Sequence, residues 1–202
     1  IIKDSGVQAV YGPKADVLKS DIQDLLESGV AIPRTEVVST NTATSETKFK
    51  GITEAVYSVA DGQAVSITEV KDPVFAQKMM GDGYAVEPVN GNVYAPVSGT
   101  VTSVFPTKHA VGILSDQGVE VLVHVGLDTV ALNGAPFSTK VADGQHVQAG
   151  DLLLVADLDA IRSADRETTI VVAFTNSAEI KSVSLVNLRQ VSKDSQVAIV
   201  EL

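Results

Sequence analysis

From residue 50 onward, hydrophobic and polar residues alternate in short runs. Stretches rich in Val, Ile and Leu are separated by Gly, Asp and Pro. Many short strands with regular turn signals between them indicate an all-β sandwich or barrel. The pentapeptide Val-Ala-Asp-Gly-Gln occurs at 59–63 and again at 141–145, which suggests a duplicated strand motif. This part of the chain is therefore predicted to fold as an all-β domain.

The N-terminal part has a different pattern. Residues 6–12 read as a strand, and the apolar positions that follow recur at helical spacing before Gly29: Val17, Leu18, Ile22, Leu25 and Leu26. One strand and one helix cannot bury a core alone. We therefore expect residues 1–28 to be the remnant of a larger domain or to pack on the rest. Residues 29–49 are rich in hydroxyl side chains without apolar periodicity, which predicts a linker.

Two of the three histidines, His109 and His124, lie on either side of the turn at 115–118. If that turn closes a hairpin through a two- or four-residue loop, His109 lies directly opposite His124 on the same face. Cross-strand partners have Cβ atoms about 5 Å apart. Two imidazoles held this close would suit proton chemistry, phosphoryl chemistry or metal binding.

The register of this hairpin decides which side chains are exposed, because a slip of one residue reverses both faces. The symmetric register gathers aliphatic residues on one face: Ala110, Leu114, Val119, Val121, Val123 and Val125. It leaves a mixed set beside the histidines: Val111, Ile113, Glu120 and Leu122. The alternative is a three-residue loop with a left-handed Gly118, which would place His124 opposite Ala110. We favour the symmetric register because it separates apolar from mixed positions more cleanly.

Composition narrows the function only slightly. The formal net charge of −10 disfavours binding to nucleic acid or to anionic membranes, and it would suit a basic protein partner or an ordinary acidic protein. The absence of cysteine excludes disulfides and thiolate chemistry in this chain and fits a cytoplasmic protein. No apolar run reaches the roughly 18 residues of a membrane span. The chain begins Ile-Ile without Met, which suggests a fragment of a longer protein.

A long motif lies within residues 105–132, which read FPTKHAVGILSDQGVEVLVHVGLDTVAL. It contains a Thr-x-His, then a Gly-x-Glu, then a strand ending in His-hydrophobic-Gly-x-Asp-Thr. Together with 72–83, 95–99, 143–145 and 147–151, it closely resembles the glucose-type enzyme IIA domain of the bacterial phosphoenolpyruvate-dependent sugar phosphotransferase system. The resemblance covers 50–202 and implies an antiparallel β-sandwich or barrel-sandwich with duplicated strand motifs. Its short helices have two candidates: Pro73–Met80 and Leu158–Ala164.

The N-terminal segment resembles the C-terminal end of a glucose-type enzyme IIB domain, in which a Gly-Val-Gln-x-Val-x-Gly strand precedes a closing helix. This resemblance implies a IIB remnant at 1–28, a Ser/Thr-rich linker at 29–49 and a IIA domain at 50–202. The cysteine that is phosphorylated in IIB lies earlier in that family and is absent here. The natural protein would then be a longer fusion such as IIC–IIB–IIA.

The resemblance also gives roles to the histidines. His124 corresponds to the phosphorylated histidine, with the phosphate on Nε2, and His109 to a second histidine whose ring N–H would bond the phosphoryl oxygens. Thr107 would orient the ring of His109. From the residues alone, a histidine ending an apolar strand is more often a packed or surface residue. A threonine in a strand usually has no such orienting role, and His146, outside the motif, is interpreted as a surface residue.

Several residues are expected to form a partner-binding surface around the histidines. Asp128 could pair with an arginine of a docking protein, although a turn or capping role is equally consistent with the sequence. Gly126 would let a phosphate or partner approach, or would simply serve the turn. The remaining members are apolar residues, for which a core position is the default, and one acidic residue: Val74, Phe75, Phe105, Val111, Leu122 and Asp72.

The resemblance implies a phosphocarrier. Phospho-HPr would donate a phosphoryl group to His124, and the domain would pass it to the Cys of a IIB domain for sugar uptake through a membrane IIC domain. No cofactor and no nucleic acid would be needed, and the domain would be a cytoplasmic part of a membrane-anchored permease. The sequence does not name the sugar, because the IIC domain that selects it is absent.

Two alternatives remain open from the sequence. One is a regulatory IIA-like module appended to a transporter. The other is a zinc hydrolase using His109, His124 and Asp128 as ligands, although it would need a further His-x-His, which the chain lacks. Zinc is not required by the favoured interpretation, but the histidine pair could bind it adventitiously.

Overall fold

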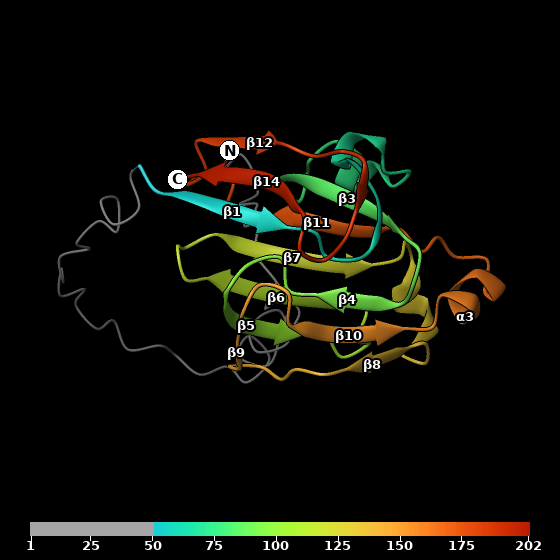
Figure 1. Ribbon diagram of the computed structural model, residues 1–202. Helices are drawn as coiled ribbons and strands as arrows, with labels where there is room; N and C mark the ends of the chain where they lie inside the picture. Colours follow the sequence, from blue (N-terminus) through green and yellow to red (C-terminus); the bar gives the residue numbers. More distant parts are fainter. Residues whose placement is uncertain (1–50) are drawn as a thin grey trace, which may run out of the picture. The chain divides into compact units, whose positions relative to one another are not determined.

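The computed structural model describes residues 51–202 (Figure 1). The predicted IIB remnant at 1–28 and the linker at 29–49 therefore lie outside the described residues. Strands dominate the described part, and every strand pair in it is antiparallel. The prediction of an antiparallel all-β domain is confirmed.

The largest sheet has eight strands in the order β13-β2-β3-β11-β7-β6-β5-β9. In chain order they are β2 (Gly62–Ser66), β3 (Asp82–Pro88), β5 (Gly99–Val104), β6 (Ala110–Ser115), β7 (Glu120–Val125), β9 (His146–Val147), β11 (Ile170–Phe174) and β13 (Gln190–Val191). Because β7 pairs with both β6 and β11, it lies well inside this sheet.

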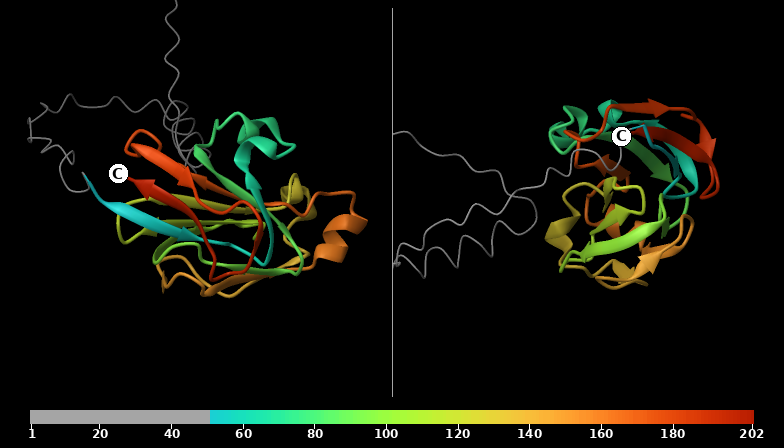
Figure 2. Two further views of the ribbon diagram at one scale, coloured as in Figure 1. Left: turned by 45° about the horizontal axis from the view of Figure 1, so that its top comes forward. Right: turned by 90° about the vertical axis from the view of Figure 1, so that its left-hand side faces the viewer.

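Two three-stranded sheets complete the fold. One has the order β1-β14-β12, from β1 (Thr53–Tyr57), β12 (Ser182–Leu185) and β14 (Gln196–Glu201). The other has the order β4-β10-β8, from β4 (Asn92–Tyr94), β8 (Phe137–Thr139) and β10 (Leu152–Ala156). Figure 2 shows the strands of residues 51–202 surrounding a common interior. One buried cluster, which includes Tyr84, Leu154 and Val200, joins all three sheets.

The repeated Val-Ala-Asp-Gly-Gln motif has a comparable structural role in both copies. The first copy leads directly into β2 and the second into β9. In each copy the Asp carboxylate accepts a backbone N–H from a distant segment, from Lys193 to Asp61 at 3.1 Å and from Val104 to Asp143 at 2.6 Å. The repeat therefore ties two turns to other parts of the fold in the same way.

The two predicted helices are present but shorter. The α-helix α2 covers Pro73–Ala76 and α3 covers Leu158–Ser163. Lys78 has a left-handed φ of 57°, which explains why α2 does not continue to residue 80. Two 3₁₀ helices, η1 (Ile67–Glu69) and η2 (Thr129–Leu132), lie before α2 and after β7.

The predicted register of the β6–β7 hairpin is wrong. Ala110, not His109, lies opposite His124. The N–H of Ser115 bonds the carbonyl of Val119 at 2.8 Å, which leaves a three-residue loop, and Gly118 in this loop has a φ of 97°. The loop is therefore the alternative that the sequence analysis considered and did not favour.

The correct register reverses which residues of β6 face the core. Val111 and Ile113 are buried, whereas Leu114 is 42% exposed. The sequence was misleading here because a polar residue faces inward at the end of the strand. Ser115 is buried, and its hydroxyl donates to a carboxylate oxygen of Glu54 at 2.7 Å. A core serine beside an exposed leucine inverts the pattern on which the prediction depended.

The other face of the eight-stranded sheet carries a smaller apolar cluster. It joins residues of η1, α2, β3, β11 and the segment after β7: Ile67, Val70, Phe75, Ala85, Leu127, Val171 and Ala173. This cluster holds α2 against the same sheet face from which the side chain of His124 projects. The half-buried Leu122 lies two residues before His124 on that face.

Candidate active site

The rings of His109 and His124 lie together. Their centroids are 4.9 Å apart and their planes are inclined by 80°. The carbonyl of His109 accepts the N–H of Val125 at 2.8 Å, so the two histidines are diagonal rather than direct neighbours across the strands. Lys108 has a left-handed φ of 55° in the turn before β6, so His109 precedes the strand and does not follow its alternation. The predicted proximity is confirmed, but the register predicted to cause it is wrong.

Two phenylalanines enclose the histidine pair. Phe75 of α2 lies 5.2 Å from the ring of His124, and Phe105 lies 5.6 Å from the ring of His109, between centroids. Burial, reinforced by the neighbouring His109, lowers the pKa of His124 from 6.5 to about 4. Burial also lowers the pKa of His109. Both rings are therefore neutral near pH 7, which is the state in which imidazole can act as a nucleophile.

The nitrogen atoms of the pair have different surroundings. Nδ1 of His109 is 2.6 Å from the hydroxyl of Thr107, so the predicted contact between these two residues is present. Nδ1 of His124 is buried and has no well-formed hydrogen bond to a described residue. The backbone of Gly126 nevertheless acts to raise the pKa of His124, as a weak or poorly aligned acceptor would. Nε2 of His124 has no hydrogen bond to a described residue, and it is accessible to solvent.

Two carboxylates lie beside His124, and both act to raise the pKa of its ring. Asp72 is the N-cap of α2, with one oxygen accepting the N–H of Val74 at 2.7 Å. Asp128 precedes η2 in a left-handed conformation with a φ of 56°, and its side chain makes no capping bond. The capping interpretation of Asp128 is therefore wrong, and its carboxylate is available to other groups.

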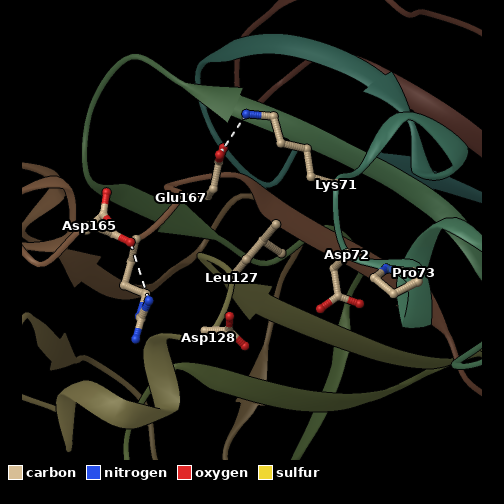
Figure 3. A pocket seen from close by; sticks show the side chains of 8 residues that line it. Lys71, Asp72, Pro73, Leu127, Asp128, Asp165 and Glu167 are labelled. Atoms are coloured by element: carbon tan, nitrogen blue, oxygen red, sulfur yellow. Dashed lines mark hydrogen bonds and ion pairs between the residues drawn. The ribbon is translucent and has the colours of Figure 1, made fainter.

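A pocket of about 280 Å³ includes Asp72 and Asp128, the two carboxylates that act on His124 (Figure 3). It lies between the start of α2, the end of β7 and the segment before β11, and Figure 3 shows Asp72 and Asp128 on its wall. The lining residues are Lys71, Asp72, Pro73, Leu127, Asp128, Asp165, Arg166 and Glu167. Lys71 and Glu167 form an ion pair at 2.7 Å. The sequence analysis missed the charged members at 71 and 165–167, because no local motif connects them with the histidines.

The apolar residues predicted around the site fall into two groups. Val74 is 40% exposed, and Phe105 and Leu122 are half-buried, so they are accessible beside the rings. Val111 is fully buried in the main core, so its predicted place on the exposed histidine face is wrong. The adjacent Met79 and Met80, both exposed, were missed as surface residues because the sequence analysis placed them in a longer helix.

His146 is exposed, as predicted, and pairs with Asp116 at 3.1 Å. Within residues 51–202, no three His, Cys, Asp or Glu side chains come together as a possible metal-binding group. The ligands required by the zinc-hydrolase alternative therefore do not converge. Among the described helices, none has the length and hydrophobicity needed to cross a membrane.

Comparison with known protein families gives a match that includes the histidine motif. The family described as "phosphoenolpyruvate-dependent sugar phosphotransferase system, EIIA 1" matches residues 54–180, which include both histidines, Thr107 and Asp128. The chain belongs to this family. The resemblance inferred from the sequence is thereby confirmed.

Individual relatives agree with this assignment. The glucose-specific EIICBA component of the phosphotransferase system from Streptococcus pneumoniae serotype 4 is 62% identical over 203 residues, covering 100% of this chain and 28% of that protein. The glucosamine-specific EIICBA component from Bacillus subtilis is 42% identical over 172 residues, covering 85% of this chain and 27% of that protein. The chain thus spans little more than a quarter of these curated relatives.

A solved structure confirms the fold. The glucose permease IIA from Mycoplasma capricolum superimposes with a TM-score of 0.67 at 38% sequence identity. The match covers 73% of this chain and 96% of that structure. The antiparallel β-sandwich of residues 51–202 is therefore the fold of an enzyme IIA domain.

Proposed function

We propose that the domain is a phosphocarrier, which accepts a phosphoryl group from phospho-HPr on Nε2 of His124. It then passes the group to the Cys of a IIB domain during sugar uptake. The observation that carries this proposal is the buried, neutral pair of imidazoles with ring centroids 4.9 Å apart. One ring offers an accessible Nε2, and the other lies close enough to contact the transferred group.

The transfer can be written without a net change in protonation of His124. The lone pair of Nε2 attacks the phosphorus of the donor phosphohistidine, a new P–N bond forms, and the P–N bond to the donor imidazole breaks. In the second step the thiolate of a IIB cysteine attacks phosphorus, and neutral His124 is released. Because Nδ1 is buried, its proton stays in place through both steps.

His109 is proposed to stabilise the transferred group. If the Thr107 hydroxyl donates to Nδ1 of His109, the ring proton of His109 lies on Nε2. That N–H can donate to a phosphoryl oxygen as charge moves in the transition state. Thr107 thus selects the tautomer that has a donor for the phosphate.

The surface around the histidines is proposed to dock both the donor and the acceptor. Asp72 and Asp128 would receive a cationic side chain of the partner, and the latter has no competing capping bond. Accessible apolar residues would pack beside them: Val74, Phe105 and Leu122. Phe75, predicted to join this surface, is buried and instead supports the ring of His124. Gly126 is buried with a φ of 76° and packs against Thr129, so it serves the turn after β7 and is not itself part of this surface. Exposed apolar residues gathered at a reactive residue, with charged contacts at the rim, are typical of a protein-docking surface.

The acceptor and the membrane domain are proposed to belong to the same natural chain. The relatives are named EIICBA components, and residues 1–28 are proposed to be the end of a IIB domain. The linker proposed at 29–49 would let a cytoplasmic IIA domain reach both donor and acceptor at high effective concentration. The names of the relatives indicate glucose or glucosamine as the kind of sugar carried.

The test is phosphoryl transfer. The chain is incubated with phosphoenolpyruvate, enzyme I, HPr and Mg²⁺, and phosphorus NMR follows the acid-labile phosphate in wild type, His124→Ala and His109→Ala. We expect no labelling of His124→Ala and residual, slower labelling of His109→Ala. Failure of the wild type to be labelled while HPr is phosphorylated would contradict the proposal. A purely regulatory module would be labelled but would not pass phosphate to a IIB cysteine.

A further inference from the structure

The segment after β7 is held tightly by backbone bonds. The N–H of Gly126 bonds the carbonyl of Thr169 at 3.0 Å, and the N–H of Leu127 bonds the carbonyl of Glu167 at 3.1 Å. Both acceptors lie just before β11, the strand paired with β7. The backbone that follows His124 is thereby anchored on its β11 side.

Thr129 holds the same segment from the other side. Its side chain is fully buried, and its hydroxyl donates to the carbonyl of Val125 at 2.6 Å. The N–H of Val125 in turn bonds the carbonyl of His109. The buried hydroxyl of Thr129 is therefore linked, through the backbone of Val125, to the chain segments that carry His109 and His124.

The methyl group of Thr129 packs directly on Gly126. A Cβ added at Gly126 would lie 2.4 Å from the Cγ2 atom of Thr129 and 2.7 Å from the carbonyl oxygen of Glu167. Gly126 also has a φ of 76°, a conformation that other residues rarely adopt. The backbone at Gly126 is thus held between Thr129 on one side and the carbonyl of Glu167 on the other.

The backbone of Gly126 also acts to raise the pKa of the His124 ring. A backbone group that favours the protonated ring must be an acceptor, hence the carbonyl oxygen. Nδ1 is buried without another partner among the described residues, and a buried N–H needs an acceptor. If the Gly126 peptide rotated, nothing described here would keep the proton on Nδ1 rather than on Nε2.

We propose that Thr129 is a positioning residue, whose hydroxyl holds the Val125 carbonyl and thereby keeps the adjoining Gly126 carbonyl against Nδ1 of His124. The ring proton is thereby kept on Nδ1, and the lone pair of Nε2 is directed toward the docking surface. The meaning for phosphoryl transfer rests on the proposed function. The tautomer itself can be measured without any phosphoryl donor.

The test compares Thr129→Val, which keeps the shape but loses the hydroxyl, with Thr129→Ser, which keeps the hydroxyl. Thr169→Val is the matched control, because Thr169 is also buried and its hydroxyl donates to Glu87 at 2.7 Å, away from Val125. Long-range proton–nitrogen NMR of the unphosphorylated full chain reports which nitrogen of His124 is protonated. The rate of labelling by phospho-HPr is measured in parallel.

We expect wild type, Thr129→Ser and Thr169→Val to be protonated at Nδ1. In Thr129→Val the two nitrogen shifts of His124 should move toward each other. Labelling should slow about tenfold, the lower end of the loss seen when metal-ligating histidines lose their orienting partners. A folded Thr129→Val with wild-type nitrogen shifts would overturn the proposal. Mixed tautomers in Thr129→Ser would overturn it as well, so the test holds even if the valine variant does not fold. A shifted tautomer without any labelling of wild type would leave this inference standing and reject only the phosphocarrier.

Discussion

The two ends of the β6–β7 hairpin differ in how completely their polar groups are hydrogen-bonded. At the turn end, the Ser115 hydroxyl donates to Glu54 and accepts the N–H of Val119 at 2.9 Å, so this buried network is closed. At the histidine end, Nδ1 of His124 lacks a well-formed bond and the Asp128 side chain caps nothing. Buried polar groups are normally satisfied, so a buried ring nitrogen with only a poorly aligned acceptor, beside an exposed carboxylate that makes no capping bond, marks the end reserved for reaction and binding.

The strongest test of this contrast is His124→Gln. The amide keeps polarity and similar size but cannot form a stable phosphoryl bond, so phosphoryl transfer should fall on the order of a thousandfold or more. Thermal unfolding should change little near neutral pH, since the site does not depend on this ring for a closed network. Transfer assays and calorimetry on the same preparation measure both effects. Substantial labelling of the variant would place the acceptor elsewhere.

Ser115→Ala should affect stability and leave transfer intact. It leaves the Glu54 carboxylate buried without its donor, which should cost about 1–3 kcal/mol in the free energy of unfolding. Ser182→Ala is the control, because this exposed serine makes a longer bond of 3.3 Å to Glu201. Denaturant titration should show a much smaller effect there. An equal loss in the two variants would remove the distinction between a closed buried network and an exposed contact.

Asp128→Asn should weaken docking. Removing this charge should raise the KM for phospho-HPr about tenfold, with a smaller change in kcat, and should reduce the salt dependence of KM. Asp116→Asn removes the same charge at the turn end, where the carboxylate pairs with His146. Steady-state kinetics at several salt concentrations should show little change in this control. Equal effects of both variants would point to net charge rather than to a local contact.

The pH dependence of stability should also differ between the two ends of the hairpin. The folded pKa of His124 is lowered to about 4, so the unfolded chain binds more protons and stability should fall as pH drops from about 6.5 toward 4. The folded pKa of Glu54 is raised by burial and by Asp116, with Ser115 opposing. Glu54 therefore makes its full contribution to the free energy of unfolding below pH 4.5, and this contribution is lost as pH rises through its folded pKa.

Urea unfolding across pH 4 to 8 measures how the free energy of unfolding changes with pH. It thereby separates the contribution of His124 at one end of the hairpin from that of Glu54 at the other. His124→Gln should flatten the loss of stability on the acid side. Glu54→Gln should remove the opposite slope. If neither substitution changes the pH profile, neither end of the hairpin has a titrating group perturbed by folding.

Local patterns in the sequence were sufficient for the fold class and the two helix positions, whereas the proximity of His109 to His124 was predicted from a register that is wrong. The register was not predictable from them, because an inward Ser115 and a left-handed Lys108 both break simple alternation. Only the distant partner Glu54 explains why a serine is buried at that position. The pocket was missed for the same reason, since Lys71 and Glu167 meet only in the folded chain.

The position of β7 between β6 and β11 has a kinetic consequence. A strand bonded on both sides is among the last parts of a sheet to open, so the amides of Val123 and Val125 should exchange with solvent only in the largest unfolding events. The acceptor histidine is thus mounted on one of the most rigid strands of the domain. Any adjustment needed to align donor and acceptor would fall to the visiting protein and to the short helix α2, while His124 stays in place.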